Sequence, residues 1–145
     1  MSMVDITSKP ESYREATAKG RIKLRAETVK RIKEGKIEKG DPIFTARIAG
    51  ILAAKNTSSI IPLCHPIPIT NVKVDVRVAS SNMVEVESTI KTKAQTGVEM
   101  EALLATAVAL LTIWDMTKQY EKDVSGQYPH TAIMDISVTA KLRSS

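Results

Sequence analysis

Apolar and polar residues alternate in several stretches of the chain with the period of two that a half-buried strand requires. Four valines alternate with charged residues over residues 72–78, and residues 84–90 repeat the pattern after the Ser-Ser-Asn sequence at 80–82. These two runs predict an antiparallel hairpin with one apolar and one polar face. A run over residues 134–142 predicts the last strand, and residues 16–24 are a less regular strand candidate.

Two helices are predicted between the first strand and the hairpin. Residues 26–34 form a short polar helix that ends at Gly35. The next helix begins sharply, because Asp41 is a good N-cap and Pro42 suits the first helical position. Apolar residues then recur with helical spacing to about Asn56.

The longest predicted helix covers residues 97–120. Its larger apolar residues are spaced to form one continuous stripe, which is typical of a helix face that packs on a core. The stripe consists of Met100, Leu103, Leu104, Ala107, Leu110, Leu111 and Trp114.

The order of the predicted elements indicates the fold. Strand, helix, helix, strand, strand, helix, strand matches the ferredoxin-like split βαβ plan of the α+β class, an antiparallel sheet with helices on one face. A chain of 145 residues is the size of one domain. We therefore expect an N-terminal arm over residues 1–15 and a single domain over residues 16–145, with a rigid irregular loop at 60–68, where three prolines exclude a helix.

Composition narrows the class of protein. The net charge of +5 indicates an anionic partner such as nucleic acid, a membrane surface or a phosphorylated metabolite. The single cysteine, Cys64, excludes an internal disulfide, and His65 and His130 lie too far apart for a structural zinc site. The apolar stretch 102–114 is too short for a bilayer and the N-terminus is charged, so we expect no membrane segment and a cytoplasmic location.

The proline-rich loop presents a candidate site. Prolines flank the Cys64–His65 region and leave His65 little backbone freedom, which suits a hydrogen-bond donor or proton carrier. The alternative is a histidine that only caps or packs. Cys64 has no base near it in the sequence, so we interpret it as a small buried apolar residue rather than a nucleophile.

Two carboxylates begin the long helix. Glu99 is explained by the helix dipole, which favours acidic residues in the first turn. Glu101 is explained less easily. Beside the free backbone N–H groups of a helix N-terminus, its carboxylate could bind the donor edge of a guanine-like ring.

A third cluster lies near the other end of that helix. Asp115 and Lys118 are three residues apart and can form an ion pair. If the pair is exposed, it is a surface salt bridge. If it is half buried, the lysine can act as an acid or as a phosphate ligand. Lys39, just before the second helix, is the best phosphate candidate. Glu101 and Asp115 are separated by about 21 Å along the helix. If both serve one site, that site must combine two subunits.

Several long motifs in a fixed order identify a resemblance. The chain is similar to the cyclic pyranopterin monophosphate synthase family, also called molybdenum cofactor biosynthesis protein C. The resemblance covers residues 3 to about 123, and it is carried by MVDIT, KGDPIFTARIAGILAAK, IPLCHPI, TGVEMEAL and TIWDMTK.

The resemblance implies an enzyme with a nucleotide-derived small-molecule substrate. It implies conversion of 3',8-cyclo-7,8-dihydroguanosine 5'-triphosphate to cyclic pyranopterin monophosphate with release of pyrophosphate, a lyase reaction in molybdenum cofactor biosynthesis. It also implies the ferredoxin-like fold and a homohexamer, a trimer of dimers, with its site between subunits. No protein-bound cofactor or metal is expected, although Mg²⁺ can accompany the triphosphate.

The resemblance also assigns roles to residues. It implies catalytic roles for Asp115 and its partner Lys118, and we add His65 and Lys39 as expected acids, bases or phosphate ligands. The expected substrate-binding residues are Leu63, Cys64, His65, Met100, Glu101, Glu99, Lys122 and, from the arm of a neighbouring subunit, Lys9 and Arg14. The C-terminal tail departs from the glycine-rich, lysine-bearing tail of many relatives, so no site residue is assigned to it. Residues 126–130 are assigned only a turn.

Two other classes of function remain open from the sequence. A small basic RNA-binding module fits the pI of 9.4 and the fold order, but the chain is only 3% aromatic and the hairpin has no aromatic residue to stack on a base. A nucleotide-sensing regulatory module would bind its ligand and release it unchanged.

Overall fold

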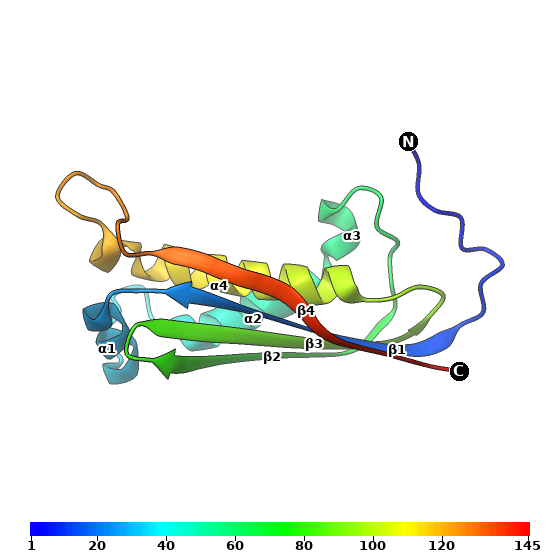
Figure 1. Cartoon of the computed structure of the whole chain (residues 1–145), viewed down its shortest axis with the longest axis horizontal. Helices are drawn as coiled ribbons and strands as arrows, with labels where there is room; N and C mark the ends of the chain where they lie inside the picture. Colours follow the sequence, from blue (N-terminus) through cyan, green and yellow to red (C-terminus); the bar gives the residue numbers. More distant parts are fainter.

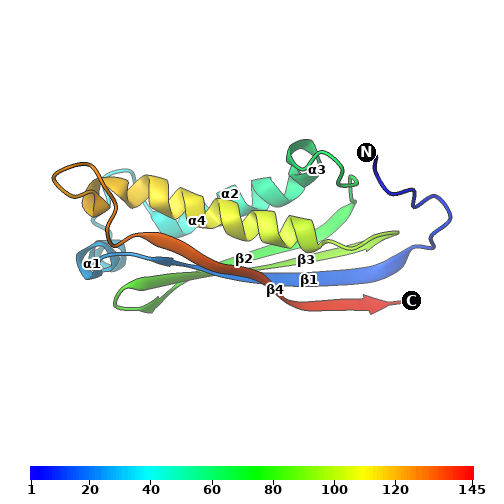
Figure 2. The same cartoon turned by 45° about the horizontal axis from the view of Figure 1, so that its top comes forward.

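The computed structural model describes residues Met1–Ser145 as a four-stranded antiparallel sheet with its helices on one face (Figure 1, Figure 2). The strand order is β2-β3-β1-β4. This order and the helix positions confirm the ferredoxin-like α+β fold. The elements are β1 (Ser12–Lys23), α1 (Ala26–Glu34), α2 (Pro42–Lys55), α3 (Thr57–Ile60), β2 (Ile69–Ser80), β3 (Met83–Ala94), α4 (Glu99–Glu121) and β4 (Ala132–Ser144).

The predicted hairpin is confirmed as β2 and β3. Val76 pairs with Val86 and Val78 with Val84, so their side chains share the face that the helices cover. Val76, Val84 and Val86 are buried in one core cluster with residues of α2 and α4. The sheet and the two long helices therefore share a single core.

The predicted helix ends are also confirmed. Asp41 caps α2, because its carboxylate accepts hydrogen bonds from the backbone N–H groups of Ile43 (3.0 Å) and Phe44 (3.2 Å). Gly35 ends α1 in the left-handed conformation, with φ of 68°, where a residue without Cβ is favoured. The segment that carries Lys39 lies between these two helix ends.

The predicted packing face of α4 is only partly confirmed: Leu110 is buried, and Leu103 and Trp114 pack against the core at its margin. The structure buries a face of mostly small side chains, Ala102, Ala105, Thr106, Ala109, Leu110, Ile113, Met116 and Thr117. Met100 and Leu111, which were expected inside, are 42% and 57% exposed. Neighbouring elements approach α4 closely: a Cβ on Gly50 of α2 would lie 3.1 Å from the Ala105 carbonyl oxygen, and a Cβ on Gly20 of β1 would lie 2.8 Å from Leu110 Cδ1.

The predicted alternation of β4 is interrupted. Its pairing with β1 shifts register twice, between Thr17 and Ala18 and between Lys19 and Arg21. Asp135 adopts a positive φ of 58° in this irregular region. Along β4, the first shift reverses the alternation after Met134 and the second restores it, so Lys141 lies opposite the buried Ala16, on the helix-covered face that it shares with Ile133.

The N-terminal strand begins earlier than the predicted arm allows. β1 starts at Ser12, so residues 12–15 belong to the sheet and only residues 1–11 form the arm. The proline-rich segment is irregular from Ile61 to Pro68, as predicted, although α3 reaches Ile60.

A buried carboxylate joins three separate elements. Glu121, at the end of α4, is 1% exposed and accepts hydrogen bonds from the backbone N–H of Arg25 (3.0 Å) and the hydroxyls of Thr131 (2.6 Å) and Thr28. The sequence analysis did not single out this residue. It ties α4 to the start of α1 and to the segment that leads into β4.

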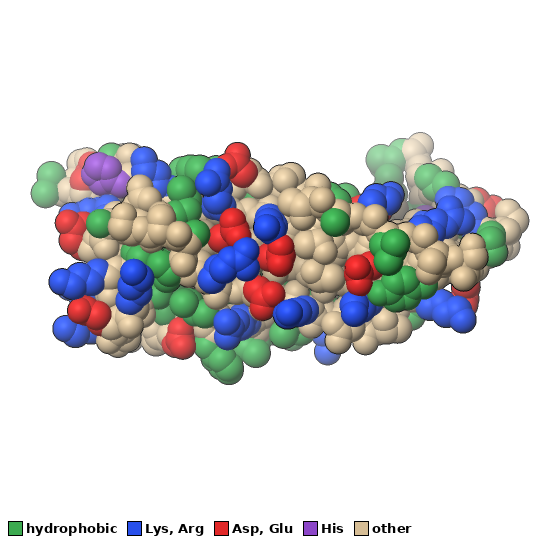
Figure 3. Space-filling model, turned by 60° about the horizontal axis from the view of Figure 1, so that its bottom comes forward, with side chains coloured by type: hydrophobic (Ala, Val, Ile, Leu, Met, Phe, Trp, Pro, Cys, Tyr) green, Lys and Arg blue, Asp and Glu red, His purple; other side chains and the backbone are tan.

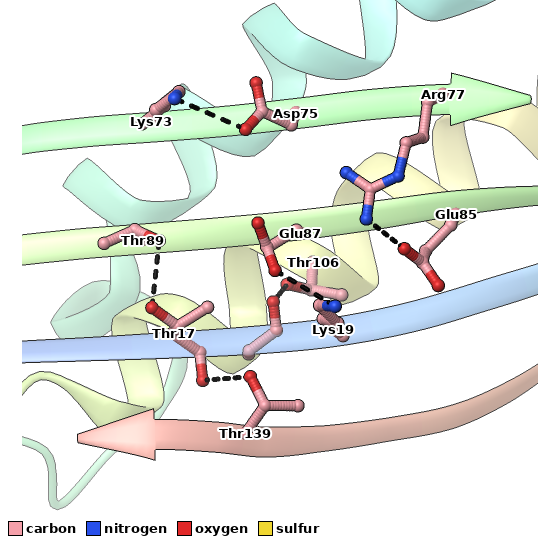
Figure 4. A network of polar contacts seen from close by, with 11 residues as sticks. Thr17, Lys19, Lys73, Asp75, Arg77, Glu85, Glu87, Thr89, Thr106 and Thr139 are labelled. Carbon is pink, nitrogen blue, oxygen red and sulfur yellow. Dashed lines mark hydrogen bonds and ion pairs between the residues drawn. The ribbon is translucent and has the colours of Figure 1, made fainter. Parts of the chain in front are cut away.

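The outer face of the sheet carries charges of both signs (Figure 3). Lys19 and Glu87 pair at 3.3 Å, Lys73 and Asp75 at 3.7 Å, and Arg77 pairs with Glu85 (Figure 4). Because these charges are neutralised in place, the strands do not present a uniformly basic surface to a phosphate backbone.

The helix α4 is long and apolar enough to cross a membrane by length and composition alone. Half of its most apolar stretch is buried inside the protein. The core helix of a soluble domain has the same composition, and α4 packs on β1, β3, β4 and α2 in that way.

Candidate active site

Three charged residues meet at the C-terminal half of α4 and are here called the Asp115 cluster. Lys39 Nζ lies 3.1 Å from Asp115 Oδ2 and 3.1 Å from the Asp115 carbonyl oxygen. Lys118 Nζ lies 3.2 Å from Asp115 Oδ1. The predicted pair of Asp115 and Lys118 is therefore present, and Lys39 joins it from the segment between α1 and α2.

Electrostatics in the cluster favours the ionised carboxylate. The hydrogen bond from Lys39, followed by that from Lys118, holds the pKa of Asp115 below its ordinary value. The side chains of all three residues remain accessible in the single chain, at about half exposure. The cluster thus offers an anionic proton acceptor between two cationic donors, on a surface that a ligand can reach.

Lys122 does not join the Asp115 cluster. It is the exposed residue that follows α4, and it lines a separate hollow with Arg25 and His130. The structure therefore gives no geometric support to the expected role of Lys122 in substrate binding.

The other end of α4 forms a second group, here called the His65 hollow. A cavity of about 320 Å³ is lined by Leu63, Cys64, His65, Glu99 and Met100. These residues come from the proline-rich loop and from the first turn of α4, two segments that the sequence analysis had treated separately. The structure brings five expected substrate-binding residues into one place.

Glu101 is the most unusual group near the hollow. It is 2% exposed, and its Oε1 atom has no hydrogen-bond partner. Burial, and to a lesser extent the charge of Glu99, raise the pKa of this carboxyl above its ordinary value. A buried carboxyl with a free oxygen is suited to a ligand that brings its own N–H donor.

Cys64 is not an activated nucleophile. Burial, and then the negative charge of Glu101, raise the pKa of its thiol. The thiol therefore stays protonated near neutral pH, in agreement with its interpretation as a small apolar residue.

Positive charge reaches the hollow from both terminal strands. Lys141 Nζ of β4 lies 3.0 Å from Glu99 Oε1, and Arg14 of β1 contributes its charge to the same carboxylate. Burial would raise the pKa of Glu99, but the hydrogen bond from Lys141 and these charges outweigh it and hold the pKa below its ordinary value. Lys141 is not among the predicted site residues, because the predicted alternation over residues 134–142 places it on the outer face, and the register shift between Thr17 and Ala18 ends that alternation before Lys141.

The arm folds against the same end of the molecule. His65 Nε2 lies 2.8 Å from the carbonyl oxygen of Val4, and Gln95 Nε2 donates to the carbonyl of Lys9 at 2.9 Å. Arg14 donates to the Gln95 carbonyl at 3.4 Å. Lys9 and Arg14 thus lie beside the His65 hollow of their own chain.

The two groups are not joined within one chain. Glu101 and Asp115 lie in the first and last thirds of the same straight helix, which runs along much of the sheet (Figure 2). The chain contains no group of three or more His, Cys, Asp or Glu residues that could hold a metal ion. One chain therefore presents two separate clusters, one cationic with a central carboxylate and one with a buried acid.

Comparison with known proteins now decides the family. The model of the MoaC family matches residues 3–143, nearly the whole chain. The chain belongs to the MoaC family. A relative from Saccharolobus solfataricus is 54% identical over 141 residues, covering 97% of this chain and 94% of the relative, and one from Pyrococcus furiosus is 53% identical over 143 residues, covering 99% and 91%. Both are named probable cyclic pyranopterin monophosphate synthase.

Membership of the MoaC family confirms the resemblance and makes the chain an enzyme of small-molecule biosynthesis. It does not favour the RNA-binding or regulatory alternatives. The expected roles of individual residues stay predictions, which the geometry above makes specific.

Proposed function

We propose that this protein is a lyase that converts 3',8-cyclo-7,8-dihydroguanosine 5'-triphosphate to cyclic pyranopterin monophosphate and pyrophosphate. The observation that carries the proposal is the Asp115 cluster, in which Lys39 and Lys118 flank one carboxylate at 3.1 and 3.2 Å. Its position in the family motif and the names of the relatives support the same conclusion.

The cluster suits the phosphoryl part of the reaction. Closing the cyclic phosphate requires a sugar hydroxyl to attack the α-phosphorus while the bond to pyrophosphate breaks. The hydroxyl proton needs an acceptor, which the ionised Asp115 supplies, and Lys39 and Lys118 can stabilise the charge on the phosphoryl oxygens. Mg²⁺ enters this proposal only as a companion of the triphosphate.

The His65 hollow suits the heterocyclic part. A guanine-derived ring presents N–H donors, and the free oxygen of the buried Glu101 is an acceptor without a partner. His65 can exchange protons with ring atoms once it leaves the Val4 carbonyl. Arg14 and Lys141 provide positive charge for phosphate oxygens.

A second copy of the chain completes the site in this proposal. The outer helix surface between the two groups is apolar, with Phe44, Ile48 and Leu52 of α2 and Leu111 of α4 all substantially exposed. A two-fold axis through the middle of α4, near Val108, would place the Glu101 end of one chain beside the Asp115 end of its partner. Each dimer would contain two composite sites, and three such dimers give the hexamer that the resemblance implies. We place the enzyme in the cytoplasm.

The first experiment tests the reaction. The protein is incubated with the cyclised guanosine triphosphate intermediate, and mass analysis follows pyrophosphate and the pterin. Asp115→Asn and Lys118→Ala should abolish product while folding and assembly stay intact, and Lys39→Ala should weaken binding of the triphosphate. Recovery of unchanged nucleotide from the parent protein would refute the proposed reaction and favour a regulatory module.

The second experiment tests the composite site. Glu101→Gln and Asp115→Asn are each inactive in this proposal, but a mixed assembly contains some sites with both residues intact. Mixing the two variants after dissociation and reassembly should therefore restore part of the activity. The matched control mixes Asp115→Asn with Lys118→Ala, which damage the same cluster and leave every site defective. Equal failure of both mixtures would show that the two groups do not share a site across chains.

A further inference from the structure

The segment that carries Lys39 has few anchors of its own. It runs between Gly35 and Asp41, and Ile37 is its one side chain buried in the core. Its backbone hydrogen bonds run from Lys36 N–H to Arg31 of α1 (2.8 Å) and from Gly40 N–H to Ile37 (3.1 Å). Neither bond involves Glu38 or Lys39, and the hydrogen bond that holds the backbone beside Lys39 comes from another element.

That element is the last turn of α4. The backbone N–H of Glu38 donates to the Tyr120 hydroxyl at 2.8 Å. Gln119 Nε2 donates to Glu38 Oε2 at 2.9 Å, but both of these side chains are in solvent. A hydrogen bond to a backbone group fixes the main chain directly, whereas a bond between two exposed side chains constrains it weakly.

Tyr120 is itself held firmly. Its ring is half buried against the core cluster, and the Arg31 guanidinium lies 4.5 Å from the ring centroid in a cation–π contact. Tyr120 also sits on the same helix as Asp115 and Lys118, so its hydroxyl and the Asp115 cluster form one rigid frame.

We propose that Tyr120 is a positioning residue for Lys39. The Tyr120 hydroxyl holds the Glu38–Lys39 backbone at the distance from α4 at which the lysine reaches Asp115. Tyr120 does not contact the Asp115 carboxylate and is not a catalytic residue. The significance of this role for turnover rests on the proposed function, but the geometric role can be measured independently of it.

The test compares Tyr120→Phe with Tyr128→Phe. The first variant removes only the hydroxyl and keeps the ring under Arg31. The second removes the hydroxyl of a tyrosine whose ring packs on Trp114, with centroids 5.1 Å apart, and is the matched control. The primary readout is the titration of Asp115, followed by NMR of the ¹³C-labelled carboxyl group, because Lys39 and Lys118 are the charged groups that face it.

Tyr120→Phe should move the titration midpoint of Asp115 upward, in the same direction as Lys39→Ala and by no more than that variant. In a Lys39→Ala background, Tyr120→Phe should have no further effect, since there is no lysine left to position. Turnover should fall by roughly two- to tenfold, the range expected for loss of one hydrogen bond. Tyr128→Phe should change neither quantity.

An Asp115 midpoint in Tyr120→Phe equal to that of the parent would overturn the proposal, whatever the activity. So would an equal shift in the presence and absence of Lys39. If the midpoint moves as expected but Asp115→Asn retains full turnover, the positioning role holds and the proposed function of the cluster fails. The two failures are therefore distinguishable.

Discussion

Replacing Glu121 with alanine is expected to cost a large part of the stability of the fold. The substitution leaves three donors without an acceptor, namely the Arg25 N–H and the hydroxyls of Thr28 and Thr131. The hydroxyls can rotate toward other acceptors, but the backbone N–H cannot. A buried donor that loses its partner costs about 1–3 kcal/mol, and a hydrogen bond to a charged group is worth about 1.5–3 kcal/mol.

We therefore expect a loss of about 3–5 kcal/mol in the free energy of unfolding, out of a total of about 5–15 kcal/mol for a typical domain. The assay is urea unfolding at one fixed protein concentration, with hydrogen exchange of the Arg25 amide as a local reporter. The matched control is Glu27→Ala, which removes an exposed partner of Arg25 and should change stability by less than about 1 kcal/mol. If Glu121→Ala were no worse than this control, the network would not be what joins α1 to α4.

Two further predictions concern the sole cysteine and a core glycine. The rate of alkylation of Cys64 by iodoacetamide should reach half its maximum at a pH above the ordinary pKa of a thiol, because burial and the Glu101 charge raise the pKa of Cys64. Glu101→Gln should lower that midpoint, and an unmoved midpoint would contradict the proximity of the two groups. Gly20→Val should destabilise the protein by about 1–3 kcal/mol or more, since even a Cβ would lie 2.8 Å from Leu110 and 2.9 Å from Ile136. A thermal unfolding midpoint unchanged from that of the parent would show that the core can relax at this point.

The sequence predicted the elements well because their signals are local. Alternation of valines and charges was sufficient for β2 and β3, and Asp41 with Pro42 located the start of α2 within one residue. The face that α4 buries was only partly predicted, because spacing alone favours large apolar residues. The close approach of α2 at Gly50 and of β1 at Gly20 is a tertiary property that spacing does not reveal.

The sequence predicted individual residues of the candidate site, but not which of them lie together in the fold. The ion pair of Asp115 and Lys118 follows from their spacing on a helix. The contact between Lys39 and Asp115 joins residues 76 positions apart, and no local pattern encodes it. Lys141 was missed for a different reason. Continued from residues 134–138, the predicted alternation would place it on the outer face, and the register shift opposite Thr17 and Ala18 changes that phase before Lys141.

The pairing of the first and last strands has a consequence for biosynthesis. β1 is made early, yet its outer edge finds its partner only in β4, with Tyr13 opposite Ser144. At a translation rate of about 5–20 residues per second, that edge stays unpaired for on the order of ten seconds. An unpaired strand edge is an aggregation hazard, so the chain carries this hazard until β4 can pair, and a truncation that removes β4 would make the hazard permanent.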